Sequence, residues 1–337
     1  AALGAGFGVA GLVLSQLPVI GDILGGIVKT LFGTKKTVTL LDQGISFAAD
    51  SVENIINNGI VGQIYQDVQT QTKKKFLGLT TSNKTSVSTT YGDLGTEMER
   101  QVALIIGSLR SGVLDAAAIL GVAGAEAALD AFQVNIGKIS LKDLKGSEIQ
   151  DALSAVFSKL GDDMAAAVMP GLQAFQRVGE GLFETLARLA KDYTTIDTAL
   201  TAIGMTFGAV GLASVAAREN LIDLFGGLDA FAEATYFFRE NFLTEAEQMA
   251  PIIAAVSAEM ARLGHAGVTT NEQFKALVLG LDLSTASGAE MYASLMAVAP
   301  AFAKVNEYAV KAADEAAAEA QRIADAAAKA AEDAAQA

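Results

Sequence analysis

Hydrophobic and polar positions change their pattern three times along the chain. The first 21 residues carry no charged side chain, and the apolar run continues to Val28. Threonine, valine, asparagine and lysine dominate the next stretch, to about Asp93, and beyond it apolar residues recur every three or four positions. These patterns predict a mainly α fold: an elongated helical assembly with an N-terminal apolar helical segment and a small β-containing region. The predicted divisions are 1–33, 34–94, 95–303 and 304–337.

The segment 1–33 is long enough to cross a membrane. Twenty-one helical residues span roughly 31 Å, which is about the thickness of a bilayer core. Gly4 and Gly8 form one GxxxG pair and Gly21 and Gly25 another, a spacing that lets membrane helices approach closely. Because Pro18 interrupts the run, a bent helix or a helical hairpin is as good a prediction as one straight span. A buried, glycine-rich core helix or a seam between proteins explains the same pattern equally well.

The region 34–94 has the composition of a small sheet. Residues 37–40 and 85–91 are rich in β-branched side chains, which favours strands. We predict that 76–80 pairs with the second of these strands across a turn at 82–84.

The body, 95–303, shows amphipathic helices with recognisable starts. The pairs Ser147/Gln150, Thr244/Glu247, Thr270/Gln273 and Ser287/Glu290 have the spacing of a capping box. After Pro170, apolar residues fall on alternating three- and four-residue steps, which is the pattern of a heptad seam. Its members include Leu172, Phe175, Leu182, Leu186 and Leu189. The seam could join identical chains, or it could be a core face within one chain. The alanine-rich, charged end, 304–337, predicts either a solvated single helix or a thin coiled-coil stalk.

Composition and charge limit the classes of function that the chain can have. The formal net charge is −14, and residues 111–303 hold eleven basic and twenty-three acidic side chains. Since phosphate backbones require clustered lysine and arginine, we expect no sequence-specific nucleic-acid binding. The chain has no cysteine, which excludes disulfides and thiolate chemistry.

Candidate chemistry is sparse, and we predict no catalytic residue, no metal site and no cofactor. His265 is the single histidine, so it cannot lead a zinc site, and no serine elbow accompanies it. The run 6–11 matches GxGxxG literally, but it lacks a preceding strand and a correctly spaced acid. Asp162 and Asp163 are neighbours on a predicted helix and therefore point about 100° apart. We expect a protein that is not an enzyme.

Long segments of the chain nevertheless resemble one family. The stretches LFGTKKTVTLLDQGISF, GQIYQDVQTQTKKKFLGLTTSNKTSVSTTYGDL and GKISLKDLKGSEIQDALSAVFSKLGDDMA resemble the C-terminal region of tail tape measure proteins of tailed bacteriophages. The stretches MTFGAVGLASVAAREN, ENFLTEAEQMAP and TTNEQFKALVLGLDLSTASGAEMYASLMAVAPAFA extend the resemblance, which covers about residues 28–310. It concerns long segments rather than a catalytic motif.

The resemblance implies a helical virion structural protein of the tail lumen and tip. Such proteins set tail length during viral tail assembly, and on infection they leave ahead of the DNA and help it cross the host inner membrane. The implied partners are copies of the chain itself, as a trimer, together with tail tube, tail tip and hub proteins. A start at alanine rather than methionine fits a C-terminal portion of a longer chain. The alternative is a membrane-active, pore-forming protein outside a virion.

Overall fold

A computed structural model describes residues 39–76, 79–145, 147–208 and 211–336 and divides them into two compact units. The first unit contains the described residues of 39–194 and 211–221, and the second contains 195–208 and 222–336. The described chain is mainly α with a small sheet, which confirms the predicted fold class. The predicted apolar segment, including Gly4, Gly8, Gly21 and Gly25, lies outside the described residues.

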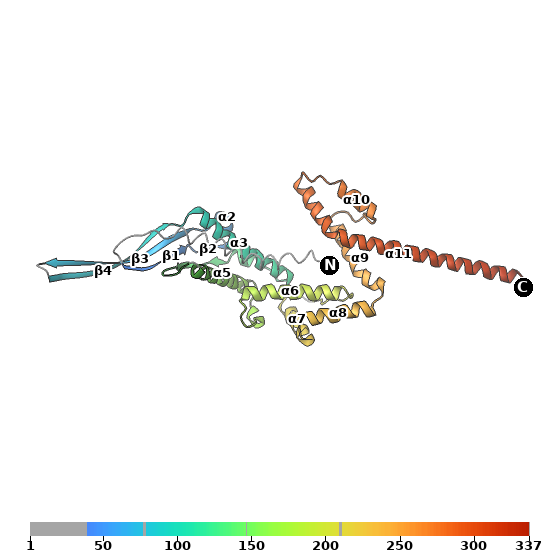
Figure 1. Cartoon of the computed structure of the whole chain (residues 1–337), viewed down its shortest axis with the longest axis horizontal. Coiled ribbons are helices and arrows are strands. Elements are labelled where there is room, and N and C mark those ends of the chain that lie inside the picture. The colour runs from blue at the N-terminus through green and yellow to red at the C-terminus, as the bar shows by residue number, and fades with distance from the viewer. Residues whose placement is uncertain (1–38, 77–78, 146, 209–210, 337) are drawn as a thin grey trace. The chain divides into compact units, whose positions relative to one another are not determined.

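The first unit is built on a four-stranded antiparallel sheet in the order β4-β3-β1-β6 (Figure 1). Its strands are β1 (Thr39–Phe47), β3 (Gly62–Phe76), β4 (Leu79–Asp93) and β6 (Gly137–Ser140). A glycine is required where β1 meets β6, because a Cβ on Gly44 would lie 1.9 Å from the carbonyl oxygen of Ile139. The short strands β2 (Asp50–Ser51) and β5 (Gln133–Val134) form a second pair.

The β3–β4 hairpin is longer than the sheet that supports it. Among the described residues, β1 pairs with β3 as far as Gln69, and the remaining residues of β3 pair with β4. Figure 1 shows this two-stranded arm reaching beyond the other strands. The ladder runs on to Phe76 and Leu79, and Asn83 pairs with Lys73 within it. The predicted turn at 82–84 is therefore wrong, although β4 does contain the predicted strand 85–91.

Helices complete the core of the first unit. They are α2 (Val52–Asn58), α3 (Thr96–Ile119), α4 (Ala125–Asp130), α5 (Ser147–Val168), the 3-10 turn η2 (Leu172–Phe175), and parts of α6 (Leu182–Thr201) and α7 (Leu212–Phe225). Val102, Ile106 and Val113 of α3 pack in one cluster with Leu153 of α5 and Ile45 of β1. Among the described helices, α3 is the one long and apolar enough to span a membrane, but soluble core helices pass the same test.

The second unit consists mainly of helices. They are α8 (Leu228–Phe242), α9 (Glu245–Arg262), α10 (Asn271–Leu279) and α11 (Ala286–Gln336). Their small core is centred on Phe274 and Phe302, whose rings lie 4.6 Å apart, with Met260 and Leu295 around them. From 309 to 331 every residue of α11 is exposed, which leaves the predicted stalk 304–337 open to either of its two interpretations.

Helix starts show where local prediction succeeds. The capping boxes at Thr244 and Thr270 are confirmed, because each hydroxyl accepts the expected backbone N–H and the glutamate or glutamine reaches back. At α11 the hydroxyl of Thr285, rather than Ser287, accepts the N–H of Gly288 at 3.0 Å. Ser147 is the first residue of α5, and Lys145 donates its N–H to Glu148 there.

The predicted divisions do not coincide with the compact units. The sheet of 34–94 shares one hydrophobic core with α3 and α5, so no boundary separates two bodies at residue 94. Likewise, α11 continues without interruption across the predicted boundary at residue 303.

Candidate interaction surface

The residues singled out for chemistry are dispersed in the described structure. His265 lies in the turn between α9 and α10 and is half-buried. Asp162 accepts the N–H of Phe183 at 2.8 Å and so caps the start of α6, whereas Asp163 pairs with Lys159 at 2.6 Å. In the described part of the chain, no three histidine, aspartate or glutamate side chains gather as metal ligands would. The GxGxxG run lies outside that part.

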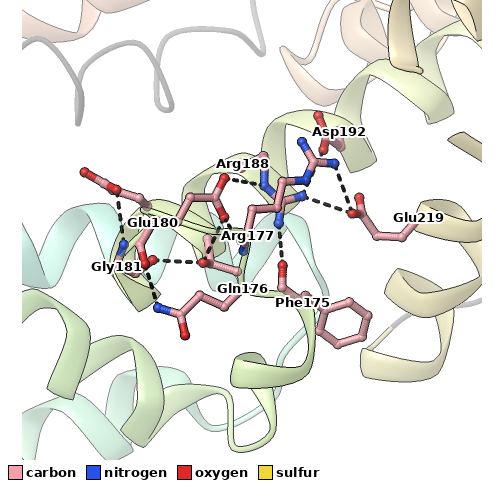
Figure 2. Close-up of polar contacts among 10 residues, drawn as sticks. Phe175, Gln176, Arg177, Glu180, Gly181, Arg188, Asp192 and Glu219 are labelled. Carbon is pink, nitrogen blue, oxygen red and sulfur yellow. Dashed lines mark hydrogen bonds and ion pairs between the residues drawn. The ribbon is translucent and has the colours of Figure 1, made fainter. Parts of the chain in front are cut away.

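The densest group of charges in the first unit is centred on Arg188 (Figure 2). Its guanidinium donates to Glu180 at 2.8 Å, to Glu219 at 3.0 Å and to Asp192 at 3.4 Å. It also donates to the carbonyl oxygen of Phe175 at 2.6 Å. One side chain on α6 thus connects η2, the loop after it, and α7.

In this cluster, burial raises the pKa values of the carboxyl groups, and the Arg188 guanidinium lowers them. Burial raises the pKa of the Asp192 carboxyl, the nearby Glu219 carboxylate adds to the rise, and Arg188 offsets only part of it. For Glu180, burial is outweighed by hydrogen bonds from Arg188 and from the N–H of Arg177, which hold its pKa below the ordinary value. Because these carboxylates share guanidinium partners within the chain, the geometry suits a structural clamp better than a proton donor to a substrate.

The predicted heptad seam belongs to the same part of the first unit. Leu172, Leu186 and Leu189 are buried in its core, and Phe175 and Leu182 pack against that core at partial exposure. The seam does not follow one helix, because η2 ends at Phe175 and α6 begins only at Leu182. A continuous seam from Leu172 is therefore wrong, and the buried leucines form the intrachain core face that was its alternative.

An exposed group of aromatic side chains lies on α8 in the second unit. Tyr236, Phe237, Phe238 and Phe242 are 63%, 61%, 43% and 66% exposed. Phe238 stacks on Phe242 with ring centroids 5.3 Å apart, and Phe237 meets Phe242 edge-on at 6.4 Å. We call these four residues the aromatic surface. On α8, only Phe231 is fully buried among the residues that the structure describes.

The area of the aromatic surface is unusual for a solvent-facing helix. Large aromatic side chains present about 200 Å² each, so the exposed parts sum to about 500 Å². The largest apolar patch of a typical monomer is about 300–600 Å² and is commonly functional. Exposing this much aromatic area to water costs free energy that binding recovers.

Periodicity alone did not point to this surface. Tyr236, Phe237 and Phe238 are consecutive in the sequence, and consecutive positions on a helix point about 100° apart. They cannot all face one core, so three consecutive aromatic residues within a helix indicate that at least one of them is exposed. Comparison of the chain with protein-family models, curated proteins and solved structures found no match.

Proposed function

We propose that this chain is a structural and interaction protein, the C-terminal region of a phage tail tape measure protein. It works in the tail lumen and tip, contributes to setting tail length during assembly, and is released on infection to help DNA cross the host inner membrane. Its partners are copies of itself, as a trimer, and tail tube, tip and hub proteins. The resemblance of long segments across residues 28–310 supports the family assignment.

The observation that carries the interaction role is the aromatic surface on α8. Because consecutive positions on a helix point about 100° apart, one partner cannot cover all four side chains; contact through Phe237, Phe238 and Phe242 of two copies buries about 700 Å² of apolar area, which is the size of a weak contact. Leu224 and Phe225 on α7, which are 76% and 43% exposed, provide further apolar area in the second unit. Arg188 and Asp162, by contrast, are occupied in an ion pair and a helix cap.

Sedimentation-velocity centrifugation of the full chain tests the interaction role. We expect the wild type to self-associate and the double variant Phe237→Ser/Phe242→Ser to sediment as a monomer. The melting temperature should hardly change, because neither side chain is buried. The matched control is Leu279→Ser/Leu283→Ser, since these residues are 74% and 55% exposed outside the aromatic surface.

Three outcomes discriminate between the functions. Equal loss of association in both double variants would show that nonspecific apolar contact, not the aromatic surface, drives assembly. A monomeric wild type would remove self-association from the proposal. Tail-tube and tail-tip genes beside this gene are expected for a tape measure protein, whereas an isolated gene with a secretion signal favours the pore-forming alternative.

A further inference from the structure

A groove of about 870 Å³ lies along α3 in the first unit. Its lining includes Ile56 on α2, Val61 just after that helix, and Ala103, Leu104, Gly107 and Ser111 on α3. The lining extends on α3 from Thr96 to Asp115 in steps of three and four residues, so one whole face of the helix is open to the groove. A helix covers about 28 Å over that distance.

The groove is lined largely by apolar side chains, and two of its charged side chains already have partners within the chain. Ile56, Val61 and Leu104 are 45%, 63% and 54% exposed, which is high for aliphatic side chains lining a concave surface. The carboxylate of Glu99 accepts the N–H of Gly62 at 2.8 Å. Arg110 is paired with Asp130 at 2.6 Å. An occupant of this groove therefore needs mainly apolar area.

Small residues on α3 allow a second helix to approach closely. Ala103, Gly107 and Ser111 recur every four residues, and a Cβ built on Gly107 meets nothing within 4 Å. This spacing of small side chains lets helix backbones pack at short range. The floor of the groove is therefore shaped for a helix that is itself rich in glycine.

We propose that the groove binds the glycine-rich apolar segment of the same chain, residues 1–28, as a helix. The segment lies outside the described residues, and its first 21 residues carry no charge. Twenty-one helical residues measure about 31 Å, close to the 28 Å of the open α3 face. The segment carries glycines four residues apart, and α3 carries Gly107 between Ala103 and Ser111 at the same spacing. Both patterns suit close packing of two helices.

The length of the connecting chain permits this contact within one molecule. β1 begins at Thr39 and reaches Phe47, which pairs with Gly62 next to the groove residue Val61. Thr39 and Phe47 are eight residues apart along the extended strand β1, which corresponds to about 27 Å. The ten residues 29–38 reach about 33 Å when extended. The inference rests on the groove and the sequence, and it holds whether or not the chain comes from a phage tail.

Cysteine crosslinking tests the proposal, because the chain has no cysteine of its own. Ser111→Cys is combined in turn with a cysteine at each of residues 11–14, which sample one helical turn and hence every face of the segment. The full-length variants are oxidised at low protein concentration and separated on non-reducing gels. We expect an intramolecular disulfide at one or two of the four positions. The matched control is Ser158→Cys, an exposed serine on α5 that does not line the groove.

A groove-filling substitution sharpens the test. Gly107→Phe meets no neighbour at its Cβ and raises helix propensity, so the first unit should fold normally. We expect it to abolish the Ser111→Cys crosslink, whereas Gly107→Ala should preserve it. Crosslinking at all four positions equally, equal crosslinking to Ser158→Cys, or disulfides formed only between chains would each overturn the proposal.

Discussion

The two units of this chain bury their hydrophobic side chains to very different extents. Among the described residues, 34 buried hydrophobic side chains form one cluster in the first unit, whereas the cluster around Phe274 and Phe302 in the second has seven. In the first unit, contacts between residues far apart in the sequence join a sheet and helices in one core. The second exposes four aromatic side chains on α8 and residues 309–331 of α11.

This difference indicates that the two units have different roles. A large buried cluster supplies enough hydrophobic free energy for a unit to hold its own shape. A small cluster with aromatic side chains left in solvent is more typical of a surface that a partner covers. We therefore interpret the first unit as a self-sufficient scaffold and the second as the part that depends most on assembly.

The largest effect should come from a cavity in the first core. Leu153 is fully buried on α5, and truncation to alanine should cost about 3 kcal/mol of the free energy of unfolding. The comparison variant is Phe302→Ala in the second core. Hydrogen exchange measured by mass spectrometry should show Leu153→Ala deprotecting α3 but not α9, and Phe302→Ala the reverse. If each variant deprotects both helices equally, the two units unfold as one and the comparison fails.

Removal of the Arg188 guanidinium should have the next largest effect. Arg188→Leu leaves Glu180, Asp192 and Glu219 grouped around an apolar side chain, which should destabilise the first unit by about 3 kcal/mol. Urea denaturation measures the change. The control is Arg322→Leu on α11, whose partner Glu319 is 2.6 Å away in an exposed pair, so the cost should be below about 0.5 kcal/mol.

The same variant should change how stability depends on pH. The pKa of Glu180 lies below its ordinary value of 4.5 in the folded chain. Its ion pair therefore stabilises fully above that value, and the stabilisation is lost as the pH falls through the folded pKa. The raised pKa of Asp192 acts in the opposite direction, because protonation relieves an unfavourable buried charge. The difference in the free energy of unfolding between wild type and Arg188→Leu should become smaller as the pH falls. A difference that stays constant with pH would contradict the role of Arg188 as a clamp.

Sequence patterns predicted features that depend on a few neighbouring residues. The capping boxes at Thr244 and Thr270 are such features, since four consecutive residues contain both hydrogen bonds. The mainly α fold class followed from periodicity in the same way. The hairpin turn was misplaced because Ser82-Asn83-Lys84 has turn composition, while the ladder that continues through it depends on pairing with Lys73 across the hairpin.

Features that depend on tertiary packing were harder to predict. Apolar spacing identified buried leucines from Leu172 to Leu189, but Gly171 and Gly179 adopt φ values of 94° and 89°, which breaks the helix that a seam requires. The clamp at Arg188 joins residues up to 31 positions apart, and no local pattern encodes that contact. The aromatic surface was missed because a helical hydrophobic pattern does not say whether a partner within the chain covers it.

The smallest predicted effect concerns a helix cap in the second unit. The Thr244 hydroxyl accepts the N–H of Glu247 at 3.3 Å, and Glu247 accepts the N–H of Thr244 at 2.8 Å. Thr244→Ala removes the first bond and should weaken α9 by about 1 kcal/mol, whereas Thr244→Ser keeps an acceptor and should cost less. Because the second core is small, we expect this modest loss to raise hydrogen exchange across α9 and α10 while α3 and α5 stay protected. Exchange confined to the first turn of α9 would show that loss of the cap only frays the helix end and that the rest of the second unit is more stable than its small core suggests, which would weaken the contrast between the units.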